Sequence, residues 1–463
     1  MPSPKLNIKP FDEDLHSFLN PKSSVASLLI NYINKHPDYD KNKGMCCLIE
    51  NGYIDRDYLI DYSIFYSRCF FDYGRKTDRI HFFNTSCSDL EKRIEKIHNS
   101  TKNLKEIDSL NTLYFGFIVK KPTPTGSIGR TVMRKYPFNS KNGDERHLNV
   151  SCTNVINLYG IPLRMISLPY QEQDHAVSAC ATISIWTALK ALEEKFHTSI
   201  ALAPSEITNF AFESSSFFDT PRFPNDGLNI YQMVNLFAKL GYEVITYELL
   251  KNVDDNEFIQ DIIIGYLSFG LPIIATLEIT DKDGKIDGHA TVISGYRFDK
   301  KENKIKKLYV HDDQITAYSS VDFIRNNFLS WNNDWRQKKG CKKVILSRFL
   351  IPVYHKIRLP FTFIYTKFIK DYRKTFTKYG LIITPLLRDV NMYKEELINE
   401  LMPKATYKEE IQNALIKQFP KYFWIIRIST IDGFPLSDTI LDATQPIVEE
   451  PYFINFHKIE NIK

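Results

Sequence analysis

The order of the periodic segments in the middle of the chain constrains the fold more than any other feature of the sequence. Three stretches carry apolar residues at helical spacing, and four shorter apolar stretches fit strands. The predicted helices are Cys180–Lys195, Asn229–Leu240 and Asp255–Phe269. The predicted strands are Tyr242–Leu249, Leu271–Ile279, His289–Tyr296 and Lys307–His311. Helices that come first and an antiparallel sheet that follows are typical of the α+β class.

The two flanking regions differ from this central stretch in composition and in the spacing of their apolar residues. The 463 residues suffice for about two to four domains. We expect an aromatic-rich α/β region at 1–155, a central domain at 156–350 and a C-terminal α/β extension at 351–463. In the first region, aromatic residues at positions 58, 62, 65, 66 and 70 have the spacing of one helix face. The sequence leaves open whether the last region is a separate small domain or extends the central sheet.

Charge and hydropathy exclude several classes of protein. The net charge of +5, from 60 basic and 55 acidic side chains, is too small to indicate a nucleic-acid partner. The segment Met1–Lys22 lacks the apolar core of a secretory signal. The longest apolar run, Ile262–Leu277, is interrupted by glycine and proline and is too short to span a bilayer. We therefore expect a cytoplasmic protein without a membrane segment.

The cysteines do not show the spacing of a metal or redox motif. There are seven, an odd number, and no pair has the CxxC arrangement. Only Cys46 and Cys47 are close in sequence, and adjacent thiols chelate one metal poorly. We therefore interpret the cysteines as free thiols of a protein in a reducing compartment.

One cysteine stands where catalysis by a thiol needs it. Ser178 or Ala179 opens the central helix, and Cys180 is its predicted first residue. The positive end of a helix dipole and the free N–H groups at a helix start favour a thiolate and a developing oxyanion. These are the two requirements of a nucleophilic cysteine.

Two later segments supply the partners that such a nucleophile needs. His289 begins a predicted strand directly after Gly288, which leaves room beside the imidazole. Asp312 and Asp313 end the next strand, and an antiparallel neighbour would bring a carboxylate beside His289. A base and an orienting carboxylate complete a catalytic triad, with Asp312 the first choice and Asp313 the alternative.

Several other polar groups lie near these residues in the sequence. Gln173, seven residues before Cys180, is the candidate side-chain donor to the oxyanion, and Gln171 is its alternative. His175 and His311 are interpreted as bystanders, because the first lacks a strand and the second should face away from Asp312. Trp186 is interpreted as a core side chain, and Asn225-Asp226-Gly227 as a turn or helix entry. Residues 126–130 lack the pattern of a phosphate-binding loop.

The order of these motifs resembles that of papain-like cysteine peptidases. Residues 165–313, about a third of the chain, are most similar to the double-glycine group that processes bacteriocin leaders. The matching motifs are Gln173 before Cys180, Gly288-His289 with Gly295-Tyr296, and Asp312. In that group the glutamine commonly stands one residue nearer to the cysteine. The resemblance implies a papain-like fold, with the nucleophile on a helix and the histidine and aspartate on an antiparallel sheet.

The expected function is that of an intracellular cysteine peptidase that hydrolyses a peptide or isopeptide bond. Cys180, His289 and Asp312 form the expected triad, Gln173 assists the oxyanion, and no metal, nucleotide or other cofactor is required. The partner is then a protein or peptide substrate. Two alternatives stay open: another acyl-transfer enzyme on this scaffold, such as a transglutaminase, deamidase or acyltransferase, and a non-catalytic interaction protein.

Overall fold

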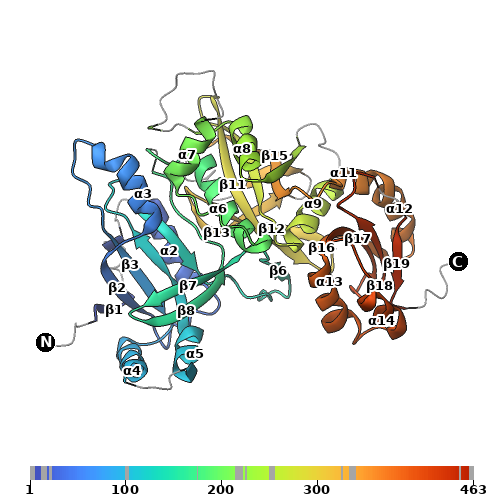
Figure 1. Cartoon of the computed structure of the whole chain (residues 1–463), viewed down its shortest axis with the longest axis horizontal. Coiled ribbons are helices and arrows are strands. Elements are labelled where there is room, and N and C mark those ends of the chain that lie inside the picture. The colour runs from blue at the N-terminus through green and yellow to red at the C-terminus, as the bar shows by residue number, and fades with distance from the viewer. Residues whose placement is uncertain are drawn as a thin grey trace.

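The described residues form three antiparallel sheets, one two-stranded hairpin and the helices that cover them (Figure 1). The computed structural model describes residues 6–11, 18–19, 23–99, 104–174, 176–213, 223–224, 227–249, 256–324, 327–332, 340–447 and 450–457. Every strand pairing of these residues is antiparallel. The mixture of helices and antiparallel sheets confirms the α+β class.

The central sheet has eight strands and closes on itself. Its order is β10-β11-β12-β13-β14-β15-β9, β6 adds to β11, and β10 also pairs with β15. This last pairing joins residues far apart in sequence, for example Ile274 and Leu350. The strands are β6 (Glu145–His147), β9 (Tyr242–Glu248), β10 (Ile273–Thr280), β11 (Ile286–Asp299), β12 (Lys304–Asp312), β13 (Thr316–Ile324), β14 (Asn327–Asn332) and β15 (Lys343–Tyr354).

Four helices pack around this sheet. They are α6 (Cys180–Phe196), α7 (Pro204–Phe212), α8 (Ile230–Lys239) and α9 (Asn256–Ser268). The three helices predicted here are confirmed within a few residues at each end. Helix α6 contacts β10, β11 and β12, and almost all of its side chains between Ala181 and Leu192 are buried. Trp186 is fully buried, which confirms its predicted place in the core.

The N-terminal region contains a five-stranded sheet of order β1-β2-β3-β4-β5 with helices on both faces. Side chains of β2 alternate, so that Cys47 and Ile49 face α2, while Cys46 and Leu48 face α4. The strands are β1 (Ile8–Pro10), β2 (Cys46–Tyr53), β3 (Thr77–Phe83), β4 (Tyr114–Lys120), β5 (Ile128–Met133) and the hairpin β7 (Cys152–Leu158) with β8 (Ile161–Ser167). The helices are α2 (Ser24–Lys35), α3 (Arg56–Ile64), the short η1 (Tyr66–Arg68), α4 (Cys87–His98) and α5 (Leu104–Leu113).

The aromatic stretch of this region is only in part the predicted helix. Helix α3 is followed by η1, which ends at Arg68, and the chain then continues to strand β3. Tyr58 and Tyr66 are buried as expected, whereas Phe70 is 98% exposed. The prediction that Phe70 belongs to the buried face is wrong, because the helix stops before it.

The C-terminal region has its own four-stranded sheet, which settles the question that the sequence left open. The sheet order is β16-β17-β18-β19, yet its core is continuous with that of the central sheet through α9. A Cβ at Gly265 of α9 would lie 2.9 Å from the Trp424 ring, so only glycine allows this close approach. The strands are β16 (Leu381–Asp389), β17 (Tyr422–Thr430), β18 (Pro435–Asp442) and β19 (Tyr452–Asn455). The helices are α11 (Phe361–Ile364), η2 (Tyr365–Ile369), α12 (Lys370–Lys378), α13 (Val390–Glu396), η3 (Leu397–Leu401) and α14 (Lys408–Ile416).

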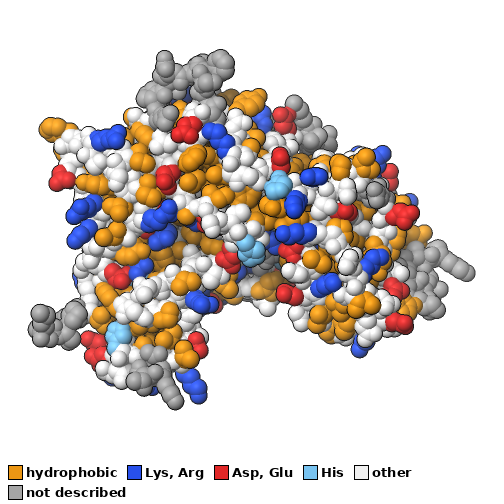
Figure 2. Space-filling model, viewed as in Figure 1, with side chains coloured by type: hydrophobic (Ala, Val, Ile, Leu, Met, Phe, Trp, Pro, Cys, Tyr) orange, Lys and Arg blue, Asp and Glu red, His pale blue; other side chains and the backbone are white. Residues whose placement is uncertain are grey.

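The surface carries charges of both signs. On the face shown in Figure 2, basic and acidic side chains are interspersed, in keeping with the small net charge. Among the described residues, no helix combines the length and the hydropathy needed to cross a lipid bilayer.

Candidate active site

Cys180 is the first residue of α6, as the sequence predicts. The preceding residue, Ala179, is extended and acts as the N-cap, and no described side chain caps the helix or places an acid in its first turn. The N–H groups of this turn therefore keep their capacity to bind an anion. Cys180 is half-buried.

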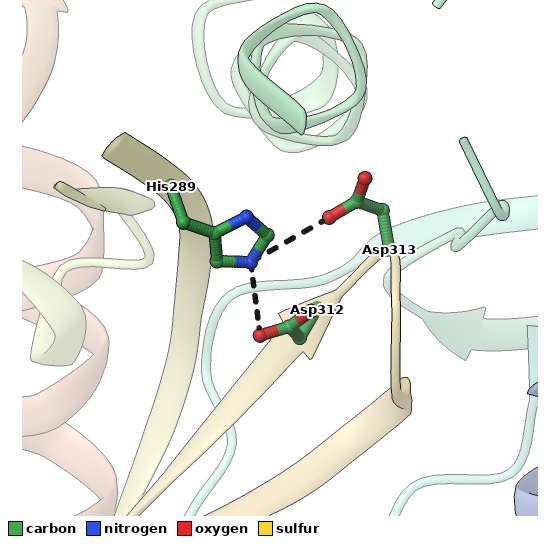
Figure 3. Close-up of side chains that lie close together, drawn as sticks. All are labelled: His289, Asp312 and Asp313. Atoms are coloured by element: carbon green, nitrogen blue, oxygen red, sulfur yellow. Dashed lines mark hydrogen bonds and ion pairs between the residues drawn. The ribbon is translucent and has the colours of Figure 1, made fainter. Parts of the chain in front are cut away.

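The β11–β12 hairpin brings His289 and Asp312 together. The strand register pairs Val292 with His311. His289 precedes Val292 and Asp312 follows His311, so His289 and Asp312 lie at the same end of the β11–β12 ladder. Nε2 of His289 lies 3.2 Å from Oδ2 of Asp312, and both side chains are almost fully buried (Figure 3). The second oxygen, Oδ1, accepts the N–H of Gln314 at 3.1 Å, which fixes the orientation of the carboxylate.

The electrostatics of His289 favour a charged ring despite its burial. Burial alone lowers the pKa of an imidazole, but the charge and hydrogen bond of Asp312, and a hydrogen bond and charge from Cys180, raise the pKa of His289 well above its ordinary value. Because Nε2 is held by Asp312, Nδ1 is the nitrogen left for the thiol, and it points away from both carboxylates (Figure 3). The arrangement places a base that Asp312 orients beside the Cys180 thiol.

Asp313 plays a different part from its neighbour. Its Oδ1 lies 3.8 Å from Nε2 of His289, and within the described part of the chain neither carboxylate oxygen has a hydrogen-bond partner. Burial and the nearby charge of Asp312 outweigh the attraction of His289 and raise the pKa of Asp313 to about 8. The geometry therefore favours Asp312 as the residue that orients the imidazole.

The two candidate oxyanion donors are both buried but differ in their partners. Gln173 already takes part in interactions within the protein. The amide nitrogen of Gln171 has no hydrogen-bond partner among the described residues. A buried donor without a partner is costly unless a ligand satisfies it, so the Gln171 amide has a donor to offer to a ligand.

A buried aspartate that the sequence analysis missed organises the loop before Cys180. Oδ1 of Asp174 accepts three consecutive backbone N–H groups, each at 3.0 Å, and the Ser178 hydroxyl at 3.1 Å. The hydroxyl of Tyr66 donates to Oδ2 at 2.7 Å, and Nζ of Lys121 lies 3.8 Å from the same oxygen. Burial opposes charge here, but Lys121, Tyr66 and the loop amides lower the pKa of Asp174 below its ordinary value. The available signal was the Asp-x-x-x-Ser spacing of a side-chain-capped turn.

A glycine of the N-terminal region lets this loop pack closely. Gly126 has a φ of +58°, and a Cβ there would lie 2.5 Å from the Asp174 Cα and the Gln173 carbonyl oxygen. The segment that the sequence analysis rejected as a phosphate-binding loop thus has a structural role beside the site.

His311 lies apart from the group formed by Cys180, His289 and Asp312. Burial lowers the pKa of His311 to about 3, and its ring lies 4.5 Å from that of Tyr318 and 6.2 Å from that of Tyr170. It is a neutral core side chain, in agreement with the sequence interpretation. His175, Asn225 and Asp226 lie outside the described residues.

Within the described residues, one group could hold a metal ion: His289, Asp312 and Asp313. Their potential ligand atoms all lie within 4.8 Å of one another, and all three side chains are buried. Imidazole and carboxylates are ligands of catalytic zinc. However, the Nε2 atom that faces both carboxylates is also the atom that Asp312 orients, so metal binding would compete with a triad.

A surface hollow lies elsewhere, between the β6 turn and the β11–β12 turn. Its volume is about 950 Å³, and its lining includes Asp144, Arg297 and Lys307 but no member of the triad. Much of its charge is already paired, as in the ion pairs of Arg297 with Asp144 and of Lys307 with Asp322. The chemistry of the site is therefore not located in this hollow.

Comparisons with protein-family models and with curated proteins found no match to this chain. The functional argument consequently depends on the geometry of Cys180, His289 and Asp312.

Proposed function

We propose that this protein is a cysteine hydrolase that cleaves a peptide or isopeptide bond in a protein or peptide substrate. The observation that carries the proposal is the position of the His289 imidazole, which is held by Asp312 on one side and interacts with a helix-terminal thiol on the other. A papain-like arrangement of the central domain belongs to the same proposal.

The reaction proceeds by acyl transfer through the thiol. His289 takes the proton of Cys180, and the sulfur attacks the carbonyl carbon to give a tetrahedral oxyanion. The imidazolium then returns the proton to the departing amine, which leaves a thioester. His289 deprotonates a water molecule that attacks this thioester, and the products are a carboxylate and the free thiol. Asp312 keeps the ring oriented and stabilises its charged form throughout.

The oxyanion is held by backbone and side-chain donors. The backbone donors are the uncapped N–H groups at the start of α6. The side-chain donor is the amide of Gln171, rather than that of Gln173. Loss of one such donor typically lowers turnover by about 10²–10³-fold. Gln171→Ala should show this loss, whereas Gln173→Ala should act mainly on stability.

Thiol alkylation tests the proposal without a known substrate. With iodoacetamide at neutral pH, Cys180 should react at least ~10-fold faster than the half-exposed Cys69 and Cys341, because among the described residues only Cys180 of these three has an imidazole partner. His289→Gln should abolish the difference, and peptide mass mapping identifies each alkylated cysteine. If Cys180 reacts no faster than Cys69 and Cys341, the triad is not functional and a non-catalytic role is favoured.

Product analysis separates hydrolysis from other acyl transfer. Incubation of peptide mixtures with the wild-type chain and with Cys180→Ala should yield new carboxyl termini only with the wild type. Accumulation of an amide formed with an added amine would instead identify a transferase.

A metal-dependent hydrolase is the second candidate, because His289, Asp312 and Asp313 offer three ligand atoms. Its activity would be lost on treatment with a chelator and retained in Cys180→Ala. The cysteine mechanism predicts the reverse for both.

A further inference from the structure

Two thiols of the N-terminal region lie almost within bonding distance, although nothing in the sequence pairs them. The Sγ atoms of Cys46 and Cys87 are 2.8 Å apart, and the residues are separated by 41 positions. A disulfide bond measures about 2.05 Å, so less than about 1 Å of further approach is needed. We propose that Cys46 and Cys87 form a reversible disulfide bond that links β2 to α4 under oxidising conditions.

The local fold fixes this pair and excludes the adjacent cysteine. Cys46 faces Phe83 across the β2–β3 ladder, and four residues after Phe83 the chain enters α4 with Cys87 as its first residue. Because side chains alternate along a strand, Cys46 points toward α4, while Cys47 points to the opposite face, where α2 packs. The β2–β3 register therefore determines which of the two neighbouring thiols can reach Cys87.

The two sulfurs differ in access, which sets the order of the chemistry. Cys46 is fully buried, and Cys87 is half-exposed. Cys87 meets the oxidant, a small disulfide such as oxidised glutathione, and its thiolate displaces one glutathione thiolate to form a mixed disulfide. Cys46 then attacks the sulfur of Cys87, its proton passes to the departing second glutathione thiolate, and the protein disulfide forms. In sum, two protein thiols are oxidised and one glutathione disulfide is reduced to two glutathione molecules.

The bond would close a loop that includes part of the candidate site. Helix α3 and η1 lie between the two cysteines, and Tyr66 of η1 donates to Asp174 before the nucleophile. Cross-linking restricts the unfolded chain, so the oxidised protein should be the more stable form. This inference does not depend on the proposed hydrolase activity.

Peptide mapping of the folded chain tests the bond. Cys180→Ala protein, which lacks the candidate nucleophile, is incubated with oxidised glutathione, alkylated at its remaining thiols and digested with trypsin without reduction. The expected product joins peptides 44–56 and 80–92 and weighs two hydrogens less than their sum. It should persist in Cys47→Ser and disappear in Cys46→Ser and Cys87→Ser. Alkylated Cys46 beside a stable glutathione adduct on Cys87, or a bond that needs Cys47, would overturn the proposal.

Thermal unfolding supplies a second readout that needs no substitution of Cys46 or Cys87. Oxidised Cys180→Ala protein should unfold about 5 °C above the reduced form, and added dithiothreitol should reverse the shift. The shift should survive in Cys47→Ser, the matched control on the opposite face of β2. Equal unfolding temperatures of the oxidised and reduced forms would contradict the proposed cross-link.

Discussion

At the scale of single residues, the central feature is the unequal use of two adjacent carboxylates. Asp312 contacts Nε2 of His289 at 3.2 Å, whereas the nearest oxygen of Asp313 lies 3.8 Å away and has no hydrogen bond among the described residues. One carboxylate therefore hydrogen-bonds the ring, and the other makes only a longer ion-pair contact with it.

The first prediction separates these roles by matched alanine substitutions. Asp312→Ala should slow the alkylation of Cys180 by at least ~10-fold at pH 6, because the imidazolium partner of the thiolate is lost. The loss should be smaller at pH 9, where thiols ionise without help. Asp313→Ala should change either rate by less than about threefold. Equal losses of the alkylation rate in both variants would show that Asp312 contributes no more than Asp313 to the reactivity of Cys180.

The second prediction concerns stability and pH. The ordinary pKa of aspartate is about 3.9 and that of Asp313 is about 8, so between these values the folded chain keeps a proton that the unfolded chain has released. The contribution of Asp313 is therefore complete below about pH 4 and is lost as the pH rises through about 8. The raised pKa of His289 has the same sign, since its contribution is complete below about pH 6.5 and is lost as the pH rises through its folded value.

The stability of the wild type should consequently fall from pH 5 to pH 9. In Asp313→Asn this fall should be smaller by about 1 kcal/mol or more, because the asparagine has no proton to lose. Urea unfolding at pH 5, 7 and 9 measures the effect. A variant that tracks the wild type at all three values would show that Asp313 is ionised in the folded protein.

The proximity of His289 and Asp312 could be predicted from sequence, because each stands near the end of a strand that pairs with the other. The distant partners of Asp174 could not, since Tyr66 and Lys121 are more than fifty positions away and follow no period. Apart from its two chain neighbours, a Cβ at Gly288 would meet nothing within 4 Å, so no distant segment requires glycine at this position. Gly295 is the constrained glycine of this strand, because the backbone of His147 approaches it closely.

At the scale of elements, the loop that enters α6 is built as much by distant segments as by its own sequence. One carboxylate, Asp174, receives the N–H groups of residues 176, 177 and 178, and side chains of η1 and of the loop after β4 hold it in turn. The loop sets the position of Cys180 at the helix start. Asp174 is therefore a positioning residue.

The third prediction tests that role. Asp174→Ala should destabilise the chain by about 2–3 kcal/mol, because three N–H groups lose a charged acceptor in a buried place. It should also slow the alkylation of Cys180, measured under conditions in which the variant is folded. Asp174→Asn keeps one acceptor oxygen and should recover part of both losses, a rescue that general unfolding would not give. Alkylation at the wild-type rate in folded Asp174→Ala would refute the positioning role.

Elements with strong local periods were the most predictable. Helices α6, α8 and α9 and strands β9 to β12 lie within a few residues of the expected ranges. The aromatic stretch was misjudged beyond Arg68, because aromatic residues are common on helix faces and in strands alike. The closure of the central sheet by the β10–β15 pairing, as at Ile274 and Leu350, depends on contacts that no local pattern encodes.

At the scale of the whole molecule, the predicted boundary after residue 155 does not isolate the site. Strand β6 comes from the N-terminal region and pairs with β11, the strand that carries His289. Nε1 of Trp186 in α6 donates to Asp57 of α3 at 2.9 Å, so the nucleophile helix is also tied to that region. We therefore expect the N-terminal region to act as part of the catalytic scaffold.

Two glycines of the same strand allow this expectation to be tested. A Cβ at Gly295 would collide with the carbonyl oxygen of His147 and the side chain of Leu148, whereas a Cβ at Gly288 would meet no atom within 4 Å apart from its two chain neighbours. Gly295→Ala should force β6 away from β11 and cost about 1–3 kcal/mol, while Gly288→Ala should stay within about 0.5 kcal/mol of the wild type. Thermal unfolding followed by circular dichroism measures both. Because β6 belongs to the N-terminal region, a loss of stability in Gly295→Ala alone would show that the docking of β6 stabilises the strand that carries His289. Equal changes of stability in both variants would show that the two regions fold independently.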